Sequence, residues 1–194
     1  MMFFMSEALN QPKKLILFTI VYNFVEGIFA IYFGAESNST SLLSFGLDSF
    51  IEITASVIAL WGLSSIDKDV EDKAEKMIAY SFLILILFII VKSSFDLFYS
   101  SKPETSFYGI VIACVSILVE GPLAYRKLQL GRKLNNKIII AEAKETLFCL
   151  NLSVLVILGV GVNYFFGLWY FDPIAALLMI PWLFREFREH KQNN

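Results

Sequence analysis

Two pairs of side chains with metal-binding chemistry lie inside apolar stretches of the chain, each with a spacing of four residues. The first pair is Asp48 and Glu52, and the second is Glu145 and Cys149. On an α-helix, side chains four residues apart lie on one face, about 40° from each other. Carboxylates and a thiol arranged in this way are ligands for one tetrahedral ion. The sequence therefore predicts a divalent metal ion bound by these four residues.

Each pair also has an interpretation without a metal. Asp48 and Glu52 could line a water-filled interior, and Cys149 taken alone is typical of a small buried apolar side chain. The position of Cys149 four residues after Glu145 favours the ligand role. Glu142 lies on the same helical face as Glu145 and Cys149, within about 60°. Whether Glu142 and Cys149 are ligands stays open at this point.

Other charged residues fall inside or at the edge of the same apolar stretches, where an ionised side chain costs at least about 2.5 to 3.5 kcal/mol. Lys92 and Asp96 are four residues apart, which favours a structural ion pair, with a proton relay as the alternative. Glu26 and Glu120 each precede a glycine in similar tripeptides. We predict accessory polar or proton-pathway roles for a set of five residues: Asn23, Glu26, Asp96, Glu120 and Glu142.

Asp172 lies directly before Pro173. Aspartate is favoured as the residue that caps a helix N-terminus, and proline is favoured in the first turn that follows. The dipeptide therefore predicts that Asp172 caps its own helix, which would begin at this point.

These side chains need helices that hold them inside a membrane. Of the 194 residues 57% are hydrophobic and 18% are charged, and the mean hydropathy is +0.64, which is well outside the range of a soluble domain. A helix of about 20 apolar residues crosses the hydrocarbon core. Six stretches qualify: 14–34, 40–62, 77–99, 105–125, 140–165 and 169–185. We therefore predict an all-α membrane protein with six transmembrane helices.

Lysine and arginine residues collect on one side of these six stretches. Of the 16 basic residues, thirteen lie around the start of the first stretch, in the connections 67–76 and 126–137, or at and after the end of the last stretch, whereas the opposite side has Lys102. By the positive-inside rule both termini are expected in the cytoplasm, with the protein in the plasma (inner) membrane. The predicted parts are a cytoplasmic segment 1–13, a transporter domain 14–185 and a cytoplasmic tail 186–194.

Composition and motifs argue against several other classes of protein. A net charge of -2 with dispersed basic residues disfavours a nucleic-acid partner. Cys114 and Cys149 both lie in apolar runs, so neither a disulfide framework nor a CxxC zinc motif is expected. The first eleven residues do not have the pattern of a cleaved signal. An intramembrane hydrolase would need a histidine or an HExxH motif within a span. We expect no enzyme activity and no enzyme cofactor.

Four motifs follow one another at the expected helices. They read Asn23-Phe-Val-Glu26-Gly27, Asp48-Ser-Phe-Ile-Glu52-Ile-Thr-Ala-Ser56, Glu145-Thr-Leu-Phe-Cys149-Leu-Asn-Leu-Ser153 and Asp172-Pro173-Ile-Ala-Ala. Together they resemble the cation diffusion facilitator, or cation efflux, family, whose membrane domain has six helices with both termini in the cytoplasm. The resemblance covers roughly residues 14–185. In that family the second and fifth helices carry the ligand pairs that match the two pairs described above.

The resemblance implies a homodimeric metal/proton antiporter that exports a divalent cation from the cytoplasm by alternating access. A thiolate favours Zn²⁺, Cd²⁺ or Co²⁺ and carboxylates suit Mn²⁺, so the expected ion is Zn²⁺, with Cd²⁺, Co²⁺, Mn²⁺ and Fe²⁺ as alternatives. Typical zinc exporters of the family have His-x-x-x-Asp where this chain has Glu145 and Cys149. Many members also add a cytoplasmic metal-sensing domain. This chain, whose one histidine is His190, is expected to be a short member without it.

Two other functions fit the same residues. A membrane protein that binds metal as a sensor or modulator of another transporter needs the same ligands without transport. A transporter of a small organic cation would use aromatic side chains, which make up 15% of the sequence. Measurement of ion flux separates the sensor from the metal transporter.

Overall fold

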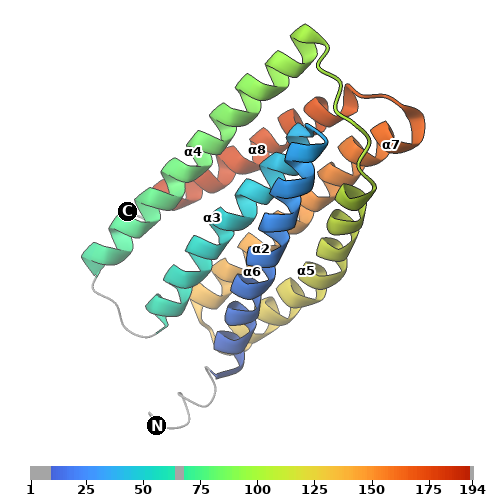
Figure 1. Cartoon of the computed structure of the whole chain (residues 1–194). Coiled ribbons are helices and arrows are strands. Elements are labelled where there is room, and N and C mark those ends of the chain that lie inside the picture. Colours follow the sequence, from blue (N-terminus) through green and yellow to red (C-terminus); the bar gives the residue numbers. More distant parts are fainter. Residues whose placement is uncertain (1–9, 64–67, 193–194) are drawn as a thin grey trace, which may run out of the picture.

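The computed structural model describes residues 10–63 and 68–192, and within these ranges it contains helices and no strand. The long helices are α2 (Asn10–Glu36), α3 (Thr40–Gly62), α4 (Lys68–Tyr99), α5 (Phe107–Lys133), α6 (Lys137–Val156) and α8 (Phe171–Gln192). They lie alongside one another in one bundle (Figure 1). The predicted all-α class is confirmed. Most of the predicted segment 1–13 and the last two residues of the predicted tail lie outside the described residues.

Five helical segments within the described ranges are long and apolar enough to cross a membrane. They are Asn10–Glu36, Thr40–Gly62, Lys76–Tyr99, Phe107–Lys133 and Lys137–Phe166. α8 has 22 residues, which is long enough, but it carries several charged residues after Phe184. We treat α8 as the sixth span because it packs lengthwise against α4 in the bundle.

Several helices extend beyond the apolar stretches that predicted them. α4 begins at Lys68 and α5 continues to Lys133. Most residues of the predicted connections 67–76 and 126–137 are helical, because α4 and α5 extend into them. Hydropathy detects only the apolar part of a helix, whereas the hydrogen-bonded backbone continues for as long as its polar side chains find partners or water.

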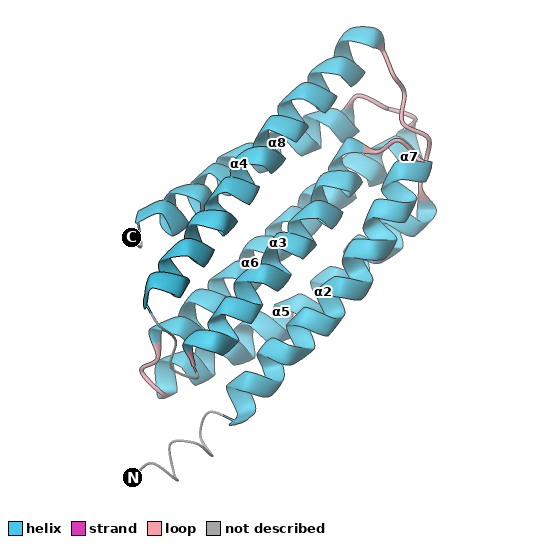
Figure 2. Cartoon of the chain, turned by 60° about the vertical axis from the view of Figure 1, so that its left-hand side comes forward, coloured by secondary structure: helices cyan, strands magenta, loops and turns pink. Residues whose placement is uncertain are grey.

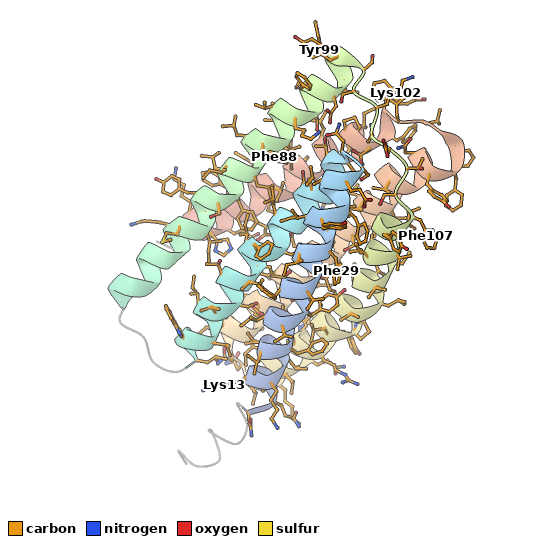
Figure 3. All side chains as sticks on the ribbon, viewed as in Figure 1. Lys13, Phe29, Phe88, Tyr99, Lys102 and Phe107 are labelled. Atoms are coloured by element: carbon orange, nitrogen blue, oxygen red, sulfur yellow. The ribbon has the colours of Figure 1, made fainter. Side chains whose placement is uncertain are left out.

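Large apolar side chains cover the outer faces of the bundle. Phe29 on α2 and Phe107 on α5 are about half exposed, and Figure 3 shows Phe107 at the edge of the bundle. Charged side chains are buried instead, among them Asp48 and Glu52 on α3. This distribution is the one expected of a protein whose outer surface contacts lipid, where a polar interior marks a pathway or a binding site.

The helices fall into two groups. α2 packs mainly against α3 and α5 against α6, whereas α4 packs mainly against α8 (Figure 2). α3 and α6 are the central helices, because 56% of the apolar window in each is buried, against 33% for α2 and α5. Side chains on the faces that α3 and α6 turn toward each other are therefore the ones most removed from lipid.

Close contact between α2 and α3 depends on small residues. A Cβ atom added at Gly46 of α3 would lie 2.9 Å from the backbone nitrogen of Ile31 on α2. Glycines at such crossings let two membrane helices approach backbone to backbone. This contact fixes the position of α3 relative to α2.

α6 continues without interruption into a π-helical segment, Ile157–Gly161, and then into the short helix α7 (Val162–Phe166). The chain turns at Gly167, whose φ of 67° lies in the left-handed region that glycine adopts without strain. The π-helical turn is packed against α8, since a Cβ atom at Gly159 would meet Ala175 at 2.8 Å.

The two ends of the bundle differ in what they contain. Asn10 and Lys133 lie at one end, which we call the terminal end, and Lys102 lies at the other, which we call the Lys102 end. Figure 3 shows Lys13 and Lys102 at these opposite ends. An even number of long helices places the beginning of α2 and the end of α8 on the same side of the bundle (Figure 1).

Asp172 does not act as predicted. α8 begins at Phe171, so Asp172 lies within its first turn rather than before it. Its buried carboxylate instead accepts hydrogen bonds at the start of α3, from Ser39 Oγ (2.6 Å), the Thr40 backbone nitrogen (2.7 Å) and Ser41 Oγ. The first amides of a helix lack partners within the helix, and a carboxylate from a neighbouring helix satisfies them here. The prediction that Asp172 caps its own helix was wrong.

Candidate functional site

The polar faces of α3 and α6 meet in the middle of the bundle. Thr146 Oγ1 on α6 donates a hydrogen bond to Glu52 Oε1 on α3, at 3.0 Å. One turn further along α3, Ser56 Oγ donates to Glu142 Oε1 at 2.7 Å. Thr146 lies between Glu145 and Cys149 in the sequence, so these contacts bring the two predicted ligand pairs to facing helices.

The predicted ligands are buried to different degrees. Asp48 is 2% exposed, Glu52 is 4% exposed and Cys149 is fully buried, whereas Glu145 is only partly buried. Spacing by four residues places each pair on one helical face, as predicted. The face of α3 is buried because α3 is central in the bundle, and Glu145 lies at the margin of the α6 face, toward α8.

Two groups of described side chains bring their ligand atoms within 4.8 Å of one another. The first group contains Glu26 of α2, Glu120 of α5 and Cys149 of α6, and all three are buried. Glu26 also accepts hydrogen bonds from Tyr22 Oη (2.9 Å) and Ser49 Oγ (3.3 Å). The structure thus gives Cys149 two carboxylate neighbours from helices outside the predicted ligand pairs.

The second group contains Glu145 of α6 and two residues of α8, Glu186 and His190. His190 Nε2 lies 2.8 Å from Glu145 Oε1. The four predicted ligands therefore do not share one group, because Cys149 belongs to the first and Glu145 to the second. Asp48 and Glu52 each interact electrostatically with Glu145 of the second group and with Cys149 of the first, so they neighbour both groups.

Several buried polar atoms in the central region have no hydrogen-bond partner in the part of the chain that the structure describes. They are both amide atoms of Asn23, both carboxylate oxygens of Glu120 and Glu52 Oε2. A buried polar group without a partner costs about 1 to 3 kcal/mol. Carboxylate oxygens left in this state beside a thiol are the donor atoms that a bound cation would satisfy.

Lys127 is a component of the site that the sequence interpretation missed. Its side chain is completely buried, and Nζ donates to Glu142 Oε1 (2.9 Å) and Thr146 Oγ1 (2.8 Å). Lys127 was counted with a basic connection, but α5 continues past it. The helical spacing from the buried Glu120, two turns earlier on α5, is a signal that could have revealed it. The Glu142 carboxylate therefore already has an ion-pair partner in Lys127.

Lys92 and Asp96 form the ion pair that their spacing predicted. The Lys92 Nζ to Asp96 Oδ2 distance is 2.9 Å, and Lys92 Nζ also donates to Asn38 Oδ1 at 2.9 Å. Asp96 Oδ2 accepts a further hydrogen bond from Thr40 Oγ1 at 2.6 Å. These contacts join α4 to the α2–α3 turn at the Lys102 end, away from the central carboxylates. The geometry favours the structural alternative over the proton relay.

Comparison with known proteins gives concordant matches. The sequence model described as the cation efflux transmembrane domain matches residues 16–186. An uncharacterized transporter of Methanocaldococcus jannaschii is 27% identical over 182 residues, and an uncharacterized transporter of Synechocystis sp. is 25% identical over 154 residues. These alignments cover 88% and 74% of this chain. They cover 64% and 50% of the two relatives, so the chain spans less than two thirds of the length of either.

Proposed function

The chain belongs to the cation efflux family, and we propose that it transports a divalent metal cation, with Zn²⁺ as the principal substrate, between the facing polar surfaces of α3 and α6. In this proposal Asp48, Glu52, Glu145 and Cys149 bind the ion during transport. Both curated relatives bear the name of transporters, which supports a transport role for this chain.

The observation that carries the proposal is the set of buried donor atoms around Cys149. A thiol and several carboxylates lie inside a bundle whose outer surface is apolar, and three carboxylate oxygens there have no partner in the described part of the chain. Burial of this kind is unfavourable for a purely structural protein, and a cation offsets it. The combination of a thiol with carboxylates favours Zn²⁺ or Cd²⁺ over Mg²⁺ or Ca²⁺.

The same ligands couple metal movement to protons. Carboxylates and a thiol must be deprotonated to bind a metal ion, so binding releases protons and protonation favours release. An antiporter uses this competition by exposing the site to the two sides of the membrane in turn. We propose export from the cytoplasm in exchange for protons, by a homodimer, in line with the family resemblance.

Transport by purified protein in liposomes tests the proposal. We expect Zn²⁺ movement driven by a proton gradient, and we expect Asp48→Asn and Glu52→Gln to abolish it. Glu104→Gln, on the exposed connection between α4 and α5, is the matched control and should transport as the wild type does. Unchanged flux in both site variants would contradict the assignment of the ligands.

The same experiment distinguishes a transporter from a metal-binding sensor or modulator that does not transport. Wild-type protein that binds Zn²⁺ with Asp48 and Glu52 but moves none across the membrane under any gradient would be a metal-binding membrane protein without transport. Flux of an organic cation without metal binding would indicate a transporter of small organic cations.

A further inference from the structure

The second group of ligand atoms, on α6 and α8, is the feature that the proposed function does not use in full. Glu145, Glu186 and His190 bring one nitrogen and two carboxylate oxygens within 4.8 Å of one another. Glu186 and His190 are each 8% exposed, although they lie one turn apart near the end of a helix rich in charged residues. The fold thus brings together and shields three side chains that would be solvated on an isolated helix.

The position of the imidazole is fixed by its neighbours. The His190 ring stacks on Phe82 of α4, with 5.8 Å between ring centroids, and Phe82 packs edge-on against Phe148 of α6 at 6.2 Å. A histidine ligand needs its ring held in one orientation so that a lone pair points at the metal. Here the aromatic contact holds the ring while Nε2 faces Glu145.

Glu186 is directed into this group. Its side chain is 8% exposed, and one of its oxygens lies within 4.8 Å of a ring nitrogen of His190 and of a carboxylate oxygen of Glu145. Arg185, the adjacent basic residue, forms its ion pair with Glu189 on the exposed side of α8, at 2.8 Å. A buried carboxylate beside a second carboxylate and an imidazole is a ligand set that suits a divalent cation.

The local charge also favours a cation. Glu145 and Glu186 share this group with one imidazole, and Asp48 of α3 is a third carboxylate that interacts electrostatically with both. Like charges in a region with little water repel strongly, and a divalent ion between them turns this repulsion into attraction. The imidazole alone can balance the negative charge of at most one of the three carboxylates.

We propose that Glu145, Glu186 and His190 form a second binding site for a divalent metal ion such as Zn²⁺, distinct from the central site around Cys149. One imidazole nitrogen and two carboxylates are three of the ligands that Zn²⁺ commonly takes, with a fourth position open to water or substrate exchange. Glu145 is shared with the proposed transport ligands, so the role of this site as a step on the ion path rests on the proposed function. The proposal that the site binds a metal ion does not rest on the proposed function.

His190 is the one histidine of the chain, which gives the test a single reporter. Protein labelled with ¹⁵N in the histidine ring, reconstituted in nanodiscs, is titrated with Zn²⁺ and its imidazole signals are followed by NMR. We expect saturable shifts of the ring nitrogens to a fixed metal-bound form. Glu186→Gln, which keeps the size of the side chain, should weaken the apparent affinity by about tenfold or more.

Two controls make the result specific. Glu189→Gln, one turn from Arg185 on the same helix, should leave the titration unchanged. Glu52→Gln disrupts the central site and should leave the Zn²⁺-dependent shift of the His190 signals in place. A Glu52→Gln protein that no longer transports Zn²⁺ but keeps these shifts would show that the two proposals are independent. Ring signals that do not respond to Zn²⁺ in the wild type, or that respond equally in Glu186→Gln, would overturn the second site.

Discussion

A buried lysine lies beside the central carboxylates. Lys127 is fully buried and bonded to Glu142 and Thr146, and Thr146 in turn donates to Glu52. The ammonium group therefore stabilises one carboxylate directly and positions the hydroxyl that binds another. Glu142 already has an ion-pair partner in Lys127, so in the proposed site we place it in the supporting structure rather than among the ligands.

Removal of this lysine should destabilise the bundle. In Lys127→Met the Glu142 carboxylate is left buried without its cation, and we expect a loss of about 3 to 5 kcal/mol in the free energy of unfolding, measured in detergent. The double variant Lys127→Met/Glu142→Gln should recover most of that loss, because the unpaired charge is gone. Arg126→Met, at the exposed neighbouring position, is the control. Equal stability of the single and double variants would contradict the ion-pair interpretation.

The thiol of Cys149 should set the preference among metal ions. We expect Cys149→Ser to weaken Cd²⁺ binding by a larger factor than Mn²⁺ binding, because a hydroxyl is a harder ligand than a thiolate. Isothermal titration with each ion gives the two ratios. Cys114→Ser, at an exposed position, is the matched control. Losses of the same size for both ions would remove Cys149 from the ligand set.

Residue spacing predicted which side chains face the interior of the bundle, but not which side chains of different helices contact one another. The four-residue rule placed Asp48 and Glu52 correctly on the buried face of α3. It could not show that Glu145 turns toward α8, because that depends on His190, which lies beyond the apolar stretch of the last helix. A tertiary contact between separate helices leaves no periodic signal in the sequence.

At the scale of the elements, α3 depends on a cap supplied by another helix. In Asp172→Ala the donors of Ser39, Thr40 and Ser41 lose their shared acceptor. We expect a loss of about 1 to 3 kcal/mol in stability, with faster hydrogen exchange in the first turn of α3, followed by mass spectrometry. Glu104→Ala, nearby but exposed, should exchange as the wild type does. Unchanged protection of this turn would show that the cap is dispensable.

The crossing of α2 and α3 should tolerate no larger residue. Gly46→Ala places a methyl group 2.8 to 3.0 Å from atoms of Ile31 and Ala30, so the two helices must separate. We expect a loss of about 1 to 3 kcal/mol in thermal stability measurements. Gly161→Ala is the control, since the nearest atom to its new methyl lies at 3.8 Å. A Gly46→Ala protein as stable as the control would indicate that the crossing can adjust.

Helix number and order were predictable, whereas helix ends were not. The predicted stretch 40–62 coincides with α3, because a turn at Asn38, with a φ of 55°, ends one apolar run and begins the next. α4 and α5 continue into charged sequence that hydropathy assigns to connections. For this reason the sequence assigned Lys127 to a connection, although it lies within α5.

At the scale of the whole molecule, the distribution of basic residues predicts the orientation in the membrane. In a Cys114→Ser background, Lys102→Cys and Lys133→Cys place single accessible thiols at opposite ends of the bundle. We expect a membrane-impermeant maleimide to label intact cells only at position 102, because the positive-inside rule puts Lys133 in the cytoplasm. Permeabilised cells should label both positions. The reverse pattern in intact cells would invert the proposed direction of transport.

Charged hydrogen bonds fasten the two helix groups to each other at the Lys102 end. There α4 and α8 are held to the start of α3 and the preceding turn by Lys92, Asp96 and Asp172. Toward the terminal end, His190 of α8 contacts Glu145 of α6. Under the proposed alternating access, opening at the Lys102 end must break the charged hydrogen bonds there. The activation barrier of that step would then set the turnover rate.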